Sequence, residues 1–329
     1  MNPQKREVIE GMDGFVAGQL GLLKPVEDSW QPQDFLPDMS EENWKDSVNE
    51  LRVRAEGLPD DLLVVLVGDM VTEEALPTYQ SLLNGFECIS DKSGTDVSAW
   101  ARWTRGWTSE ENRHGDLLNK YLYLTGRVDM RAIEVTIQHL IRNGFDPGTA
   151  NDPYKGFVYT SFQERATKIS HKNVANLCHA AGDNRLQDIC SLIATDEARH
   201  EKAYTNFMGH IFEQDPKGAV LAFRDILRKQ VVMPAHLMDD GANPDLFENF
   251  SEVAQRLGVY TAVHYAEITA HLVKCWRVEQ LNGLNGEAAE AQDYLCGLAP
   301  RYEKLAKRHN RRQKPPSLRQ FKWIFNRSI

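Results

Sequence analysis

The sequence predicts an all-α fold in which a four-helix bundle is embedded in a larger helical domain. Most of the chain follows the 3.6-residue apolar period of amphipathic helices, and few stretches carry strand signals. Two Glu-x-x-His motifs, Glu111…His114 and Glu197…His200, lie 86 residues apart in segments with that period. Because residues i and i+3 share one face of a helix, each motif presents a carboxylate beside an imidazole. Metal-binding helix bundles carry this pair of side chains on facing helices.

The apolar period also predicts where the main helices lie. In the first of them, Pro77 has no N–H to bond the carbonyl of Glu73, so we expect a kink beside Glu73. The fifth has Asp183 or Asn184 in position to cap its N-terminus. The predicted helices cover residues 60–87, 100–124, 130–144, 157–181, 185–211, 216–230 and 252–278.

The composition is that of an ordinary globular protein, with 42% hydrophobic and 26% charged residues. No linker-like change in composition and no repeat of 20–50 residues divides the chain. We therefore expect one domain over 1–329, with an N-terminal segment (1–40), a bundle core (60–212), and additional helices with a C-terminal tail (213–329). The apolar run at 62–71 is too short to span a bilayer and contains an aspartate.

Net charge and cysteine content limit the kinds of partner and the cellular compartment expected for the protein. A net charge of −9 argues against general nucleic-acid binding. Five cysteines without a Cys-x-x-Cys pair indicate reduced thiols in an intracellular compartment. The opening residues, MNPQKREVIEGMDGF, lack the features of a signal or transit peptide, so we expect a mature chain from which any targeting segment has been removed.

The bundle hypothesis requires two further carboxylates, one on each partner helix. Glu73 and Glu164 each lie among residues that otherwise form a buried helix face, where a carboxylate needs a partner. Along the chain the order is then a single Glu, a Glu-x-x-His pair, a second single Glu and a second pair. The predicted ligands are Glu73, Glu111, His114, Glu164, Glu197 and His200.

The predicted ligand set also indicates which metal it binds. Four carboxylates and two neutral imidazoles carry a charge of −4, which matches two divalent ions. Oxygen donors with nitrogen suit iron or manganese better than zinc, and iron is favoured if the site activates oxygen.

The alternative for either motif alone is a solvated or ion-paired helix face. Glu74, Glu110 and Glu201 are interpreted as neighbours on other helix faces, not as ligands. The other histidines considered, His236, His264 and His271, show no ligand spacing.

Several longer strings surround these residues. They include LKPVEDSWQPQDFLPD (23–38), VVLVGDMVTEEALPTYQ (64–80), WTSEENRHGDLLNKYLYLTGRVDMR (107–131), YTSFQERATKISH (159–171), DEARHEKAYT (196–205), PAHLMDDG (234–241) and AQRLGVYTA (254–262). Over nearly its whole length the chain resembles the soluble plant acyl-acyl-carrier-protein desaturases, the stearoyl desaturase family of plastids. Ferritins and ribonucleotide reductase small subunits share the metal spacing but not these strings.

The resemblance implies a ferritin-like, homodimeric enzyme with a carboxylate-bridged di-iron centre, two Fe ions per subunit. Such an enzyme inserts a cis double bond into a saturated C16 or C18 acyl chain carried on acyl carrier protein. Reduced ferredoxin supplies electrons, O2 binds as a peroxo bridge, and oxygen leaves as water. The implied location is the plastid (chloroplast) stroma.

The resemblance also assigns roles to individual residues. All six predicted ligands stand at the family's ligand positions. Thr167 matches a threonine near the oxygen-binding side, and Trp30, His114 and Asp196 match residues proposed to link the cluster to the surface for electron entry. From the residues alone, Thr167 could equally bond its own helix, Asp196 could be a surface carboxylate, and Trp30 is a buried aromatic.

Three positions depart from the family pattern: Lys168, Asp239 and Phe86. They leave open the chain length and the double-bond position, including a position other than Δ9. A bulky ring at Phe86 would shorten the substrate tunnel; the alternative is that it packs against a neighbouring helix and never touches substrate.

Acyl carrier protein is acidic, so we expect it to dock on a basic rim. Two rival functions stay open, a di-iron hydroxylase or oxidase and a ferritin-like iron protein. The candidate rim residues are Lys24, Lys168, Lys172, Arg199, Lys202, Arg228 and Lys229.

Overall fold

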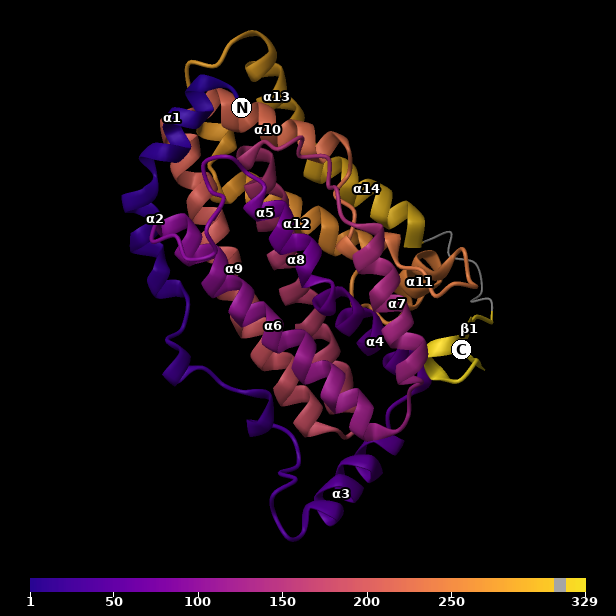
Figure 1. Cartoon of the computed structure of the whole chain (residues 1–329). Coiled ribbons are helices and arrows are strands. Elements are labelled where there is room, and N and C mark those ends of the chain that lie inside the picture. The colour runs from indigo at the N-terminus through magenta and orange to yellow at the C-terminus, as the bar shows by residue number, and fades with distance from the viewer. Residues whose placement is uncertain (311–317) are drawn as a thin grey trace.

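Four long helices form the centre of the molecule (Figure 1). In the computed structural model, α4 packs on α6, α8 on α9, α4 on α8 and α6 on α9, which closes a four-helix bundle. The structure describes residues 1–310 and 318–329, so 311–317 of the predicted C-terminal tail lie outside the described residues. The bundle helices are α4 (Asp60–Glu74), α6 (Ala99–Thr125), α8 (Pro153–Ala180) and α9 (Asn184–Gln214).

Further helices surround the bundle, and the all-α prediction is confirmed. One short hairpin pairs β1 (Gln320–Phe321) antiparallel with β2 (Arg327–Ser328). The other α-helices are α1 (Pro3–Gly11), α2 (Asp13–Gln19), α3 (Trp44–Glu56), α5 (Leu76–Asn84), α7 (Met130–Asn143), α10 (Pro216–Arg228), α11 (Leu246–Arg256), α12 (Ala262–Cys275), α13 (Gly286–Cys296) and α14 (Leu298–Asn310).

Short polar side chains fix where the bundle helices begin. Asp183 accepts a hydrogen bond from the N–H of Leu186 at the start of α9, as its predicted role as a cap requires. Asp152 caps α8, which has a proline in its first turn, and Ser98 caps α6. The ligand-bearing faces of these helices therefore start from defined positions.

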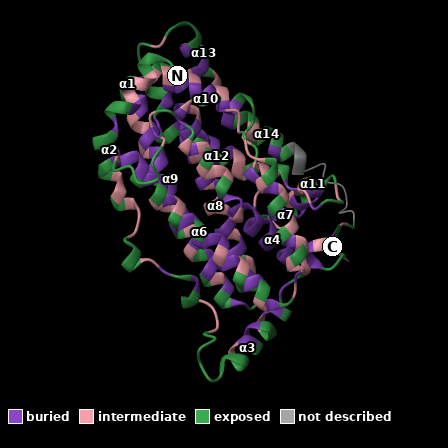
Figure 2. Cartoon of the chain, in the orientation of Figure 1, coloured by how far each residue is buried: buried purple, intermediate pink, exposed green. Residues whose placement is uncertain are grey.

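Helix α4 lies in the interior of the molecule (Figure 2). Every residue from 62 to 73 is buried, so the helix is apolar on nearly all sides. Asp69 and Glu73 are exceptions to this apolar surface, and both lie in the core. Buried carboxylates need partners, and those of Glu73 determine the site described below.

The predicted helix 60–87 is wrong as a single helix, because α4 ends at Glu74 and α5 begins at Leu76. Pro77 stands in the first turn of α5, where its missing N–H costs no hydrogen bond. The predicted kink beside Glu73 is therefore present as a break between two helices.

The predicted helix 252–278 is also wrong as a single helix. Helix α11 ends at Arg256, and Gly258 follows with a φ of +72°, a conformation that glycine adopts without strain. Thr261 then caps α12 through the N–H of His264. These glycine and threonine signals were present in the sequence.

The N-terminal part of the chain runs along the outside of the bundle. After α1 and α2 it continues without long helices to α3 at the opposite end of the molecule (Figure 1). On the way Trp30 enters the core, with an exposure of 8%. Helices α1, α2, α3, α13 and α14 were not predicted; α3, for example, buries only Val48, Leu51 and Ala55.

Among the described residues, the longer helices are too polar to cross a lipid bilayer.

Packing at Gly68 gives a test of the core of the bundle. A Cβ at this position would lie 2.0 Å from the ring of Phe250, whereas a Cβ at Gly209 of α9 would meet nothing within 4 Å. We expect Gly68→Ala to destabilise the protein by about 1–3 kcal/mol through overpacking. Gly209→Ala, the matched control, should stabilise it by roughly 0.5–1 kcal/mol. Urea unfolding measures both, and equal effects of the two substitutions would contradict the packing.

Candidate metal centre

The six predicted ligand side chains meet inside the bundle, and each is at most 8% exposed. They form two sets whose ligand atoms lie within 4.8 Å of one another, and the sets share Glu111 and Glu197. Each set also has one carboxylate that the other set lacks, which we call its outer carboxylate. We name the sets the α4 site and the α8 site, after the helix that supplies this residue. The α4 site comprises Glu73, Glu111, His114 and Glu197, and the α8 site comprises Glu111, Glu164, Glu197 and His200.

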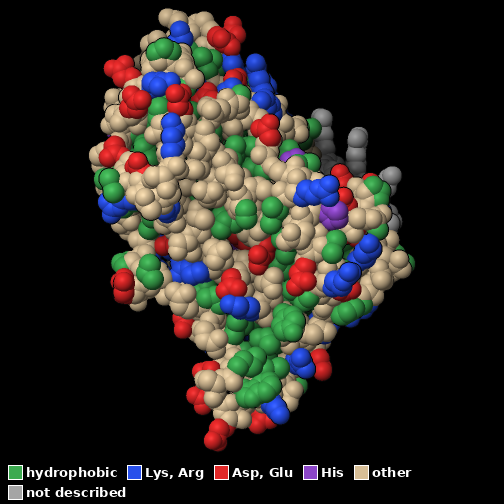
Figure 3. Space-filling view, viewed as in Figure 1, with side chains coloured by type: hydrophobic (Ala, Val, Ile, Leu, Met, Phe, Trp, Pro, Cys, Tyr) green, Lys and Arg blue, Asp and Glu red, His purple; other side chains and the backbone are tan. Residues whose placement is uncertain are grey.

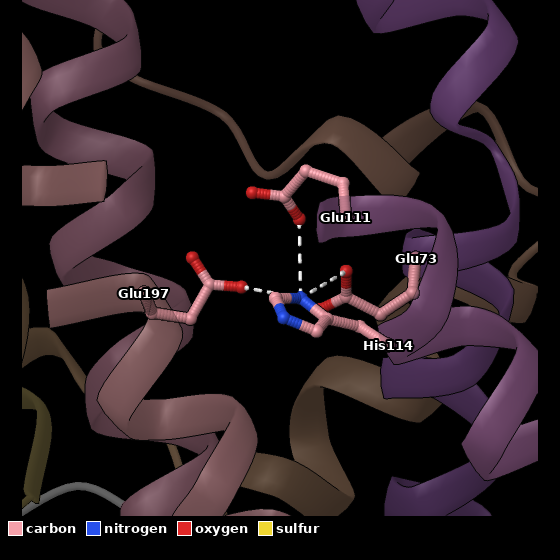
Figure 4. A group of neighbouring side chains, drawn as sticks. All are labelled: Glu73, Glu111, His114 and Glu197. Atoms are coloured by element: carbon pink, nitrogen blue, oxygen red, sulfur yellow. Dashed lines mark ion pairs between the residues drawn. The ribbon is translucent and has the colours of Figure 1, made fainter. Parts of the chain in front are cut away.

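In the α4 site the ring of His114 faces three carboxylates (Figure 4). Its Nδ1 lies 3.2 Å from oxygens of Glu111 and Glu197 and 3.8 Å from Oε2 of Glu73. In the α8 site, Nδ1 of His200 lies 2.7 Å from Oε1 of Glu111. Both Nδ1 atoms therefore point into the cluster, so each can offer its lone pair to a metal ion there.

The outer nitrogens of both imidazoles face carboxylates that belong to the opposite motif. Nε2 of His114 lies 3.5 Å from Asp196, and Nε2 of His200 lies 2.9 Å from Glu110. The contact with Glu110 is a hydrogen bond, which holds the hydrogen on Nε2 of His200 and leaves its Nδ1 free to bind metal, whereas Nε2 of His114 faces Asp196 without a hydrogen bond between them. Glu110 was interpreted only as a neighbour, and its role was missed. The signal was an acidic residue before the Glu of each motif.

A ring of polar contacts lies outside the imidazoles. The indole N–H of Trp30 donates to Asp196 at 2.8 Å, and the Trp30 ring stacks on His114 with centroids 6.1 Å apart. Arg199 bonds Glu110 at 2.8 Å and Asp196 at 2.6 Å. Trp30, Asp196 and His114 thus form one continuous contact chain. Arg199, a candidate for the docking rim, forms ion pairs here with Glu110 and Asp196.

The two outer carboxylates each meet a nitrogen that sequence reasoning missed. Nε2 of His171 lies 2.8 Å from Oε1 of Glu73. The indole N–H of Trp107 donates to Oε1 of Glu164 at 3.1 Å. His171 stands seven residues after Glu164, two helical turns on, so its spacing could have placed it on the bundle face.

Thr167 lies between two interpretations. Its hydroxyl donates to the carbonyls of Gln163 and Glu164 in its own helix, both at 3.1 Å, which is the alternative considered for it. The same side chain lines a cavity beside the carboxylates. Its position suits contact with a reactant, while its hydrogen bond is local.

Burial makes the metal-free site electrostatically unfavourable. It raises the pKa of Glu73 to about 7 and that of Glu164 well above its ordinary value. Burial acts in the same direction on Glu111, but the imidazoles of His200 and His114 hold the pKa of Glu111 below its ordinary value. Ionising all four carboxylates in this core therefore requires compensating positive charge.

Within the described part of the chain, several ligand atoms also lack hydrogen-bond partners. Oε1 of Glu111, Oε2 of Glu164 and Nδ1 of both imidazoles are buried without one. Native structures rarely leave such atoms unsatisfied. Oxygen and nitrogen donors of this kind suit two divalent ions such as iron, so the residues fit the predicted metal pair.

An apolar cavity borders the carboxylate side of the site. It is lined by all four carboxylates, by Thr167 and by apolar and aromatic side chains, including Tyr79, Leu82, Leu83 and Phe145. Among the described residues that line it, neither imidazole is present. The carboxylates thus face the cavity, and the imidazoles face the N-terminal segment.

The three positions that depart from the family pattern have local explanations. Phe86 does not line the cavity; its fully buried ring packs on Gly156, where an added Cβ would lie 2.4 Å away. Phe86 also does not lie on the same helix as Glu73, because α4 ends at Glu74 and α5 covers Leu76–Asn84. Lys168 pairs with Glu201, and Asp239 accepts a hydrogen bond from the N–H of Gly241.

A family model described as Fatty acid desaturase matches residues 4–325. The chain belongs to this fatty acid desaturase family. It is similar to the chloroplastic stearoyl-acyl-carrier-protein 9-desaturase of Simmondsia chinensis, with 58% identity over all of this chain and 83% of that protein. It is 57% identical to such a desaturase of Oryza sativa subsp. japonica over 99% of this chain and 84% of that one. The Ricinus communis desaturase is 56% identical, covering 100% and 83% of the two chains.

A solved structure supports the fold independently. DesA2 from Mycobacterium tuberculosis H37Rv matches with a TM-score of 0.56 over 84% of this chain and 97% of that chain, at 16% identity. That identity supports the shared fold alone. This chain is therefore ferritin-like in fold, as predicted. Its family places it among the oxidoreductases.

The ligand assignment predicts that Glu197→Ala and His200→Ala lose iron and become less stable, because a lost ligand leaves its partners' charges unbalanced. Iron per subunit and thermal unfolding measure the two effects. Glu74→Ala is the control, since Glu74 precedes the break beside Glu73 but belongs to neither ligand set. Retention of two irons in both ligand variants would remove the assignment.

Proposed function

We propose that this desaturase uses O2 and reduced ferredoxin to insert a cis double bond into a C16 or C18 acyl chain on acyl carrier protein. The observation that carries the proposal is the juxtaposition of four buried carboxylates with an apolar cavity. The names of the relatives supply the substrate class. The chloroplastic relatives also support a location in the plastid stroma.

An unactivated methylene cannot be oxidised by amino-acid side chains, so a metal-derived oxidant is required. When bound, a pair of iron ions would supply that oxidant from O2. Glu73, His114, Glu164 and His200 would each hold one ion, and Glu111 and Glu197, which belong to both sets, could serve both ions. Every other contribution comes from the cavity and the contacts around it.

The cavity binds and orients the acyl chain and keeps water away from it. Three donors in its wall are satisfied within the protein: the Tyr79 hydroxyl donates to the carbonyl of Thr72 at 2.9 Å, and Tyr159 and Gln163 both donate to the carbonyl of Val232 at 3.0 Å. The wall thus favours methylene groups. Burying each methylene contributes about 0.8 kcal/mol.

Electron entry is proposed along the contact chain Trp30, Asp196 and His114. The chain joins the N-terminal segment to the imidazole side of the metal centre, opposite the acyl cavity. Ferredoxin could therefore deliver electrons without contact with the acyl chain. Thr167, on the cavity side, is proposed to hold a proton near the reacting carbons, for which its hydroxyl must release a carbonyl of its own helix.

The proposed docking rim is smaller than the sequence suggested. Lys168 and Arg199 form ion pairs with buried carboxylates, and Lys24 lies 3.9 Å from Asp196. On the face in Figure 3, basic side chains are interspersed with acidic ones. The four exposed members of the original rim are Lys172, Lys202, Arg228 and Lys229.

We also propose a homodimer, because the family resemblance implies one. Apolar side chains gather over the α3 end of the face in Figure 3, and on α3 Trp44 and Val53 are 37% and 66% exposed. A subunit contact would remove such surface from water. Gel filtration separates a dimer from the cage that a ferritin-like iron protein would form.

The proposed reaction is tested by incubating the iron-loaded protein with ferredoxin, a reductant, O2 and a panel of acyl carrier protein thioesters. Mass spectrometry of the product should locate a new cis double bond. A hydroxylated chain would instead support the di-iron hydroxylase, which shares the metal centre. Consumption of O2 without any change in the acyl chain would reject both.

Docking on exposed basic residues predicts that affinity for acyl carrier protein falls steeply between about 50 and 200 mM salt. Lys202→Glu should weaken binding further at low salt, because it reverses an exposed rim charge. Lys120→Glu, at an exposed position of α6 outside the proposed rim, is the control. An affinity independent of salt would reject the electrostatic rim.

Phe86 predicts a preference for the shorter substrate. Its ring packs on Gly156, one helical turn from the cavity residue Thr160, and it follows the cavity residue Leu83 by three positions. The ring lies behind the cavity wall and not in it, so we propose that it limits substrate length indirectly, by holding Leu83 and α8 in place, and that sixteen carbons are favoured over eighteen by roughly tenfold. Turnover of both substrates by the native protein and Phe86→Leu measures this. A native preference for eighteen carbons, or one that Phe86→Leu leaves unchanged, would show that the ring only packs.

A further inference from the structure

The two metal sites are alike in their ligands but differ in the groups that hold their outer carboxylates. Both imidazoles have a carboxylate at Nε2. By contrast, Glu73 of the α4 site meets an imidazole, His171, and Glu164 of the α8 site meets an indole, Trp107. The two ions are therefore not held by equivalent surroundings.

This difference is present in the sequence as well as in the packing. Seven residues after Glu164 the chain has His171, but seven residues after Glu73 it has Gln80. Four residues before the Glu of the first motif stands Trp107, and the second motif has an isoleucine there. Neither donor has a counterpart related by the internal symmetry of the ligands.

The surroundings of His171 indicate that its contact with Glu73 is its main function. The residue is 2% exposed, and its Nδ1 has no hydrogen-bond partner among the described residues. The neighbouring Ser170 hydroxyl donates to Asp69 at 3.2 Å, not to the ring. A buried imidazole costs free energy relative to an apolar side chain, and the bond from Nε2 to Glu73 offsets it.

The bond also orients the ligand. With Oε1 of Glu73 held by His171 at 2.8 Å, the other oxygen, Oε2, lies 3.8 Å from Nδ1 of His114 and faces the metal cluster. Both the charged ring and one neutral tautomer carry a hydrogen on Nε2, so this geometry does not depend on the charge of His171.

We propose that His171 is a positioning residue for the α4 site and that Trp107 has the corresponding role at the α8 site. Each donor fixes one outer carboxylate, so each sets the affinity of one metal ion and leaves the other ion nearly unaffected. This inference rests on the proposed metal pair but not on the desaturation reaction.

The test uses the full-length apoprotein and anaerobic binding isotherms with Fe²⁺, and with Co²⁺, whose visible absorption reports ligand geometry. His171→Asn keeps a polar side chain but is too short to reach Glu73, whereas His171→Gln keeps an N–H near the position of Nε2. Loss of an outer contact to a ligand typically costs 10–100-fold in metal affinity. We expect His171→Asn to lower the affinity for one of the two ions by roughly tenfold or more. His171→Gln should bind both ions with native affinity.

Trp107→Phe supplies the complementary arm of the test. Alone it should lower the affinity for one ion, and combined with His171→Asn it should lower the affinity for both. If the double variant still binds one ion with native affinity, both donors act on the same site and the proposal is overturned. It is also overturned if His171→Asn leaves both affinities unchanged or if His171→Gln fails to restore binding.

Two controls separate local from general effects. His210→Asn, on the partly exposed surface of α9, should leave both affinities and the cobalt spectrum unchanged. If His171→Asn does not fold, as judged by helical circular dichroism, His171→Leu replaces it without adding an unpaired polar group. A native protein that binds fewer than two ions would reject the proposed metal centre itself, whereas unchanged binding in the His171 variants rejects only the positioning role.

Discussion

The structure depends on the burial of four carboxylates in one helix bundle. Each of the four central helices contributes one, so the apolar faces cannot close without bringing these charges together. Desolvated carboxylates are unfavourable unless cations and hydrogen-bond donors compensate them. The imidazoles, the outer donors His171 and Trp107, and the paired Arg199 form successive layers of such compensation. A pair of metal ions would supply the remaining positive charge.

The same arrangement separates two kinds of chemistry. The carboxylates face an apolar cavity, and the imidazoles face a polar layer beneath the N-terminal segment. Helix α5, which follows the break at Ala75, contributes to this separation by supplying Tyr79, Leu82 and Leu83 to the cavity wall. Under the proposed function, substrate and electrons would therefore approach from different sides.

Much of the centre could be predicted from the sequence because i, i+3 spacing within a helix is a local property. Two motifs and two isolated buried glutamates were sufficient to find six side chains that meet in space. His171 and Glu110 were missed because their partners lie on other helices, so their contacts depend on packing that spacing alone does not specify. Trp30 and Asp196 were found only through resemblance, since their contact joins residues 166 positions apart.

The limits of the fold prediction have the same origin. The long buried helices carry a strong apolar period, and their existence was predicted correctly. The breaks at Ala75 and Gly258 were missed because the period continues across them. Proline and glycine were the local signals, but only tertiary packing decides whether such a residue bends a helix or ends it. Short helices such as α3 bury too few residues to give a clear period.

The central claim is that these six buried side chains hold two iron ions. Anomalous X-ray diffraction at the iron absorption edge, from crystals of the iron-loaded protein, tests it most directly. The account predicts two anomalous peaks in each subunit, one in the α4 site and one in the α8 site, with Glu111 and Glu197 between them. A single peak, or peaks outside the two sets of residues, would contradict it.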